Sequence, residues 1–182
     1  IPAVLERLQR EAPDIALDIM TPSDVSYLNV EQGKVDMVIN RFDSMPQSFH
    51  QNTVWQDSFS CLLSVDNPVL AGGFDLESYL QAQHVWVSKT GMGVGVGVDP
   101  SAVQDLGWVD EALARLGRKR RITVFTRHYQ VAVLLARQKH LVVTVPSKLA
   151  LLMRDNPRVA IKPPPFEIPP FELKMAWSPL LQ

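Results

Sequence analysis

The chain has 182 residues, of which 46% are hydrophobic and 20% charged, and its formal net charge at pH 7 is -1. This composition is typical of a globular protein that can bury one core or two small ones. It excludes bulk electrostatic attraction to nucleic acid or to an anionic membrane, and no apolar run reaches the roughly 18 residues that a membrane span needs.

The first third of the chain predicts helices alternating with strands. The stretch "IPAVLERLQREAP" places its apolar residues on one helical face, and because a protein rarely begins inside a helix, we expect further residues upstream of Ile1. A second helix is expected from Thr21, as its N-cap, to a stop at Gly33. Strands are expected over residues 15–20 and 35–40, with one or two more within 53–65.

The remaining chain continues the alternation. Helices are expected over residues 75–81, 99–117, 127–138 and 146–153. Strands are expected over residues 84–88, 121–126, 141–145, 159–163 and 171–177. The proline-rich "PPPFEIPP" between the last two strands indicates a rigid connector. The order β-α-β-α-β, repeated roughly twice, predicts an α/β fold with largely parallel sheets.

The stretch "SKTGMGVGVGV", residues 88–98, resembles a phosphate-binding loop only superficially. Its glycines do not match the G-x-G-x-x-G spacing of a dinucleotide-binding turn, and its Lys89-Thr90 pair precedes the glycines instead of following them. We therefore interpret it as a loop that approaches a ligand closely or reshapes on binding, with a plain surface loop as the alternative.

Other chemical signals are weak. Cys61 lies in the apolar run "SFSCLLSV", which favours a buried, inert thiol over a nucleophile. The four histidines lack metal-ligand spacing, and no acid pair or G-x-S-x-G elbow is found, so we expect no enzyme, metal or cofactor. The basic cluster "RLGRKRRITVFTR" lacks interleaved aromatics for base stacking and favours a solvated face over nucleic-acid contact.

Several segments together resemble a known family. The segments, in order, are "GKVDMVINRFDSMP", "WQDSFSCLLSVDNPVL", "DLESYLQAQHVWVS", "VDEALARLGRKRRITVFTRHYQVAVLLARQKHLVVTVPSKLA" and "PPPFEIPPFELKMAW". This series resembles the C-terminal effector-binding domain of LysR-type transcriptional regulators over nearly the whole chain. The family's first strand, the loop after it and its last helix have no counterpart here.

The resemblance implies two Rossmann-like lobes, arranged like a type 2 periplasmic binding protein, with a ligand cleft between them. Lobe one would comprise residues 1–65 plus 146–182, and lobe two residues 66–145. A winged helix-turn-helix DNA-binding domain is expected upstream, so that DNA would be bound only through that domain. The family also implies a cytoplasmic homodimer or tetramer, in which the first helix and the helix near residues 131–138 are candidate contacts.

The effector site is expected at the carboxyl ends of the strands, where ligands bind in open α/β sheets. Hydroxyls, cations and aromatic rings at these ends suit a small organic acid or a polar aromatic. The candidate effector-binding residues are Thr21, Asn40, Arg41, Phe42, Ser88, Lys89, Thr90, Gly91, Phe125, Thr126, Arg127 and Thr144.

Two alternatives remain open at this point. One is a periplasmic solute-binding protein of a transporter, and the other is an enzyme on the same two-lobed fold. The identity of the effector, the target genes and the direction of regulation are not encoded in any motif of the chain.

Overall fold

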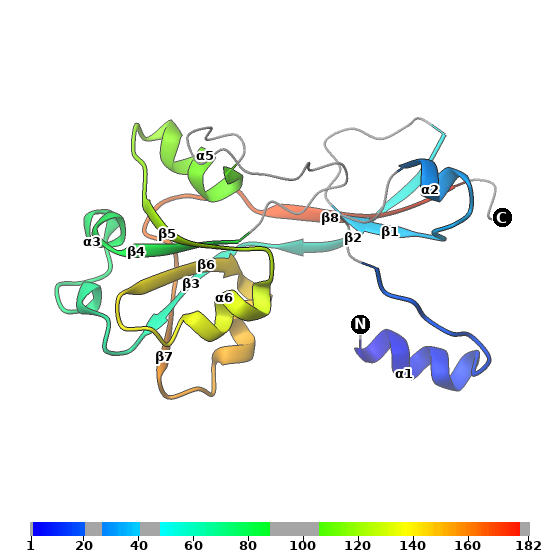
Figure 1. The fold of residues 1–182 in the computed structure, drawn as a ribbon, viewed down its shortest axis with the longest axis horizontal. Helices are drawn as coiled ribbons and strands as arrows, with labels where there is room; N and C mark the ends of the chain where they lie inside the picture. Colours follow the sequence, from blue (N-terminus) through cyan, green and yellow to red (C-terminus); the bar gives the residue numbers. More distant parts are fainter. Residues whose placement is uncertain (1, 21–26, 41–47, 88–105, 179–182) are drawn as a thin grey trace.

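A computed structural model describes residues 2–20, 27–40, 48–87 and 106–178. Its strands form two sheets, a three-stranded sheet of order β1-β8-β2 and a five-stranded sheet of order β5-β4-β6-β3-β7. Figure 1 shows the two sheets side by side along the long axis of the molecule. None of the described helices is both long and apolar enough to cross a membrane.

The three-stranded sheet consists of β1 (Val38–Asn40), β2 (His50–Asp57) and β8 (Phe171–Trp177), and both of its pairings are antiparallel. The helix α2 (Tyr27–Glu31) lies above it in Figure 1. Gly33 follows this helix with a φ of 66°, which confirms the predicted glycine stop, because this conformation strains any residue with a Cβ.

The five-stranded sheet consists of β3 (Phe59–Ser64), β4 (Gln83–Val87), β5 (Arg121–Thr126), β6 (Leu141–Pro146) and β7 (Val159–Lys162). Only β4 with β5 and β4 with β6 pair in parallel, whereas β3 runs antiparallel to both β6 and β7. The expected α/β class is confirmed, but the expectation of largely parallel sheets is wrong.

Helices cover both faces of this sheet. One face packs against α6 (Tyr129–Leu135) and α7 (Ser147–Ala150), and its core contains Leu62, Val85 and Val143. The other face packs against α3 (Leu76–Gln81) and α5 (Trp108–Arg115), and its core contains Leu63 and Val142. Short 3-10 turns at Pro68–Leu70 and Leu151–Met153 complete the element order.

The amino-terminal segment differs from the prediction. The helix α1 (Pro2–Glu11) forms as expected but buries none of its residues, and Figure 1 shows it apart from both sheets. Residues 15–20, predicted as a strand, are not in a strand, and Ile15, Leu17 and Ile19 are exposed. The alternating pattern is present, but a strand also needs a hydrogen-bonding partner, and none of the described residues provides one.

The sheets also divide the chain at positions other than the proposed lobe boundaries. The predicted boundaries assign residues 59–64 and 159–162 to lobe one, but β3 and β7 are hydrogen-bonded within the five-stranded sheet. The chain crosses from one sheet to the other between Asp57, the last residue of β2, and Phe59, the first residue of β3.

Candidate functional site

Three parallel strands end together on the side of the five-stranded sheet that faces the other sheet. The parallel pairings of β4 with β5 and with β6 align their carboxyl ends, and Val87 lies opposite Thr126. Figure 1 shows these ends directed toward β1, β2 and β8. In open α/β sheets this edge is where ligands bind, so the fold places a candidate site here.

Hydroxyl groups gather beside this edge. Ser147, directly after β6, has its Oγ atom 3.0 Å from Oγ of Ser58 and 2.8 Å from Oγ of Ser60. Both partners lie at the start of β3 or immediately before it, 89 and 87 positions away in the chain. A hydroxyl both donates and accepts hydrogen bonds, so this cluster can adapt its proton arrangement to a polar ligand.

Thr126 and its neighbours form the second part of the edge. The Oγ1 atom of Thr126 accepts a hydrogen bond of 3.1 Å from the backbone N–H of His128, where α6 begins. Arg127 is exposed, and Phe125 is 47% exposed. The predicted residues of this segment therefore lie at the surface, where Arg127 can offset the charge of an acid.

The remaining predicted site residues fall into two groups. Asn40 and Thr144 are buried, with 3% and 6% exposure. The hydroxyl of Thr144 contacts the buried side chains of Tyr79 and Cys61. A direct contact between this hydroxyl and an effector would require it to give up these partners. The other predicted residues lie outside the described residues: Thr21, Arg41, Phe42, Ser88, Lys89, Thr90 and Gly91.

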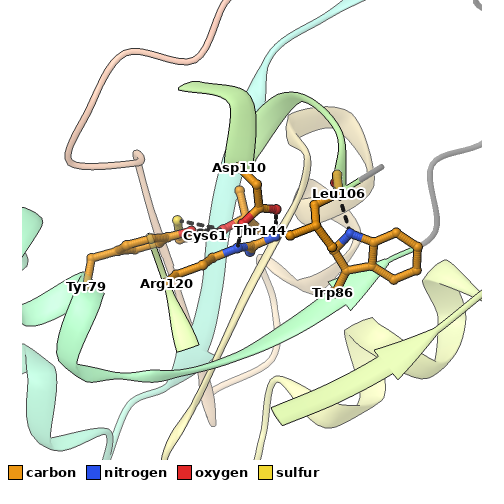
Figure 2. A network of polar contacts seen from close by, with 7 residues as sticks. All are labelled: Cys61, Tyr79, Trp86, Leu106, Asp110, Arg120 and Thr144. Carbon is orange, nitrogen blue, oxygen red and sulfur yellow. Dashed lines mark hydrogen bonds and ion pairs between the residues drawn. The ribbon is translucent and has the colours of Figure 1, made fainter. Parts of the chain in front are cut away.

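Thr144 belongs to a buried polar network (Figure 2). Its Oγ1 atom lies 2.9 Å from the hydroxyl of Tyr79 and 3.5 Å from Sγ of Cys61. Beside it, Arg120 donates two hydrogen bonds to the Asp110 carboxylate, at 2.9 and 2.7 Å. The residues of the network come from α3, α5, β3, β6 and the position before β5. The network therefore helps to hold α3 and α5 against this face of the five-stranded sheet.

The environment of this network suppresses ionisation of its neutral members. Burial raises the pKa of the Cys61 thiol to about 12, and it also raises the pKa of the Tyr79 hydroxyl. The ring of His84 lies beside the ring of Tyr79, with centroids 4.3 Å apart, and burial, followed by the charge of Arg120, lowers the pKa of His84 to about 3. These groups stay neutral near pH 7, so Cys61 is the inert thiol that its sequence context predicts.

Arg120 shows what the sequence reasoning missed. The basic cluster predicts a solvated face, but the Arg120 side chain is 3% exposed and paired with Asp110. Arg118 from the same cluster forms an exposed ion pair with Glu77 at 2.6 Å. The sequence does not predict the serine cluster either, because Ser147 lies 89 and 87 positions from its partners Ser58 and Ser60.

Comparison with known proteins shows which family this chain resembles. Residues 1–181 match the family model described as the LysR substrate binding domain. The regulator SyrM of Rhizobium meliloti (strain 1021) is 27% identical over 179 residues, which are 97% of this chain and 51% of that protein.

Two solved structures agree in fold. A probable transcriptional regulator from Pseudomonas aeruginosa is 25% identical with a TM-score of 0.79, covering 98% of this chain and 57% of that one. The regulatory domain of MexT, a transcriptional activator of the same organism, is 28% identical with a TM-score of 0.72. The match covers 97% of this chain and 82% of that one. These matches give no support to the alternative of a transporter's solute-binding protein.

The chain spans about half the length of the curated relatives that it matches.

Proposed function

This chain belongs to the LysR substrate-binding domain family, and from that premise we propose that it senses a small-molecule effector for a transcriptional regulator. The effector binds between the two sheets, against the carboxyl ends of β4, β5 and β6. The observation that carries the proposal is that Thr126, Arg127 and Ser147 all lie at this edge, two hydroxyls and one exposed cation.

The chemistry of this edge favours a small organic acid or a polar aromatic. Arg127 supplies positive charge for a carboxylate, and the hydroxyl cluster around Ser147 supplies donors and acceptors for further polar atoms. The exposed ring of Phe125 covers an apolar part of the ligand. The glycine-containing residues 88–98 directly follow β4, so we assign them to the same site.

The sheets suggest revised lobes for this function. Lobe one then comprises residues 1–58 plus 170–182, and lobe two residues 59–169, so that each lobe contains one sheet. The effector changes the balance between two lobe arrangements only as far as it binds them with different affinity.

The regulator is proposed to act as a homodimer or tetramer in the cytoplasm, with DNA bound by a domain upstream of this chain. Both helices predicted as dimer contacts present apolar side chains to solvent. On α1, Val4 and Leu5 are 59% and 40% exposed, and on α6, Val131 and Leu134 are 41% and 58% exposed. Burying such side chains between two protomers is favourable by about 1.5–3 kcal/mol for each that becomes fully buried.

The proposal is tested by thermal shift and calorimetry on the full-length protein with succinate, benzoate and glutamate as probes. A probe present at about 100 times its dissociation constant stabilises the fold by roughly 2.7 kcal/mol. Arg127→Gln is expected to weaken binding of an acid about tenfold, because a charge-assisted contact is lost.

The matched control is Arg121→Gln, which removes an exposed arginine at the opposite end of β5 and is expected to leave affinity unchanged. Equal affinity losses in both variants would refute the placement of the site. If none of the small-acid probes binds, the proposed ligand class is refuted.

A further inference from the structure

Two chain segments cross between the sheets side by side. Asp57, at the end of β2, pairs with Phe171, at the start of β8. An aromatic cluster of Phe59, Phe171 and Trp108 holds this crossing to α5, with ring centroids 5.0 Å apart for Trp108 and Phe171 and 5.2 Å apart for Phe59 and Phe171. Aromatic packing is less strictly directional than hydrogen bonding, so this cluster holds the sheets together while leaving some freedom in the angle between them.

A second set of contacts at the crossing is polar and directional. The backbone N–H of Ser147 donates to the carbonyl of Ser58 at 2.8 Å, and the backbone N–H of Lys148 donates to Oδ2 of Asp57 at 3.1 Å. Both donors open α7, which packs on the five-stranded sheet through the buried Ala150. We call the residues Asp57, Ser58, Ser147 and Lys148 the clasp.

The side chain of Lys148 extends the clasp to the other sheet. Its Nζ atom donates to the carbonyl of Gln56 at 2.9 Å and lies 3.9 Å from the centroid of the Trp55 ring. Trp55 and Gln56 belong to β2 of the three-stranded sheet. Lys148 therefore holds one particular orientation of α7, and with it the five-stranded sheet, against β2.

We infer that the clasp sets the angle between the two sheets and that Lys148 is its positioning residue. The inference rests on the proposed function, because Ser147 belongs both to the clasp and to the hydroxyl cluster of the candidate site. A ligand that hydrogen-bonds Ser147 competes with the hydroxyls of Ser58 and Ser60. Ligand binding thereby acts on two residues of the clasp, Ser58 and Ser147.

The size of the effect follows from the exposure of these groups. Lys148 is exposed, and a cation over an aromatic ring at an exposed site contributes enough to change an equilibrium by about two- to fivefold. Loss of the Lys148 ammonium therefore shifts the populations of the sheet arrangements without unfolding the protein, since the aromatic cluster remains.

The test measures the distance between the sheets in the full-length protein by pulsed electron spin resonance. Spin labels are attached to Asn52→Cys on β2 and Lys162→Cys on β7, both exposed positions, whereas the native Cys61 is fully buried. Labelled protein is diluted with unlabelled protein, so that only labels within one chain are close. Lys148→Met keeps the hydrocarbon stem over Trp55 and removes the charge.

Lys148→Met and Asp57→Asn are expected to lower the ratio of the main distance population to the others about two- to fivefold. Lys148→Arg restores the population, because a guanidinium also stacks on an indole ring. The matched controls are Lys139→Met and Asp66→Asn, which remove exposed charges on the five-stranded part of the chain and leave the populations unchanged.

An unchanged distance distribution in Lys148→Met and Asp57→Asn overturns the inference, as does an equal change in the two controls. The measurement is made without effector, so it is independent of the proposed ligand. If the clasp variants shift the distances while no acid probe binds the unmodified protein, the inference holds and the proposed ligand class fails.

Discussion

The buried His84 makes the stability of this domain depend on pH. Its ring is 0% exposed, one ring nitrogen, Nε2, lies 2.7 Å from the carbonyl oxygen of Tyr79, and Nδ1 has no hydrogen-bond partner among the described residues. Burial and the nearby charge of Arg120 lower its pKa to about 3, compared with about 6.5 in an unfolded chain. Between these two pH values the unfolded chain binds a proton that the folded chain does not.

The sign of the effect follows from this proton count. Because the unfolded state binds more protons, the free energy of unfolding falls as pH falls through the window from about 6.5 to about 3. His84 alone is expected to lower the free energy of unfolding by about 2 kcal/mol between pH 8 and pH 5, and by roughly 5 kcal/mol once the pH is below 3.

The assay is urea unfolding at pH 8, 7, 6 and 5 for the unmodified domain and for His84→Gln. Glutamine can still donate to the Tyr79 carbonyl but does not titrate, so the stability difference between the two proteins is expected to change by about 2 kcal/mol across this range. The control His140→Gln removes an exposed histidine and should keep the original pH dependence. Parallel curves for the unmodified domain and His84→Gln would refute the reasoning.

Two further predictions concern the buried network. Asp110→Asn is expected to lower the free energy of unfolding by about 3–5 kcal/mol, because it leaves the buried Arg120 charge without its partner. Glu77→Gln in the exposed pair with Arg118 should cost much less, because solvent screens that pair. Urea unfolding measures both, and equal losses would contradict this account of burial. Cys61 is expected to resist a thiol reagent such as Ellman's reagent at pH 8 until urea unfolds the domain. The reason is that its thiol is fully buried and has a pKa of about 12. Rapid labelling of the folded protein would contradict this prediction.

Features that depend on a few neighbouring residues could be predicted from the sequence. The cap of α3 is one: Asp75 accepts a hydrogen bond of 2.8 Å from the backbone N–H of Ser78, and the Ser78 hydroxyl accepts one of 3.0 Å from the N–H of Asp75. The predicted helix stop at Gly33 is another, since this residue has a φ of 66°. Short-range signals of this kind, together with the family resemblance, were sufficient for the α/β class and for the parallel strands β4, β5 and β6.

Features that depend on residues far apart in the chain were decided by the tertiary structure. The apolar alternation over residues 15–20 describes a surface that suits a strand, but pairing requires a neighbouring strand. The direction of β3 was set by its pairing with β6 and β7, not by its own residues.

The same limit applies to the candidate site. The sequence placed Thr126 and Arg127 at a strand end correctly, because the strand itself is a local feature. It could not show that Ser147 meets Ser58 across 89 positions, that Thr144 points into a buried network, or that Arg120 is enclosed with Asp110. A side chain's burial and partners are set by the packing of whole elements, so the sequence determined which chemical groups are available and the tertiary structure decided which of them meet.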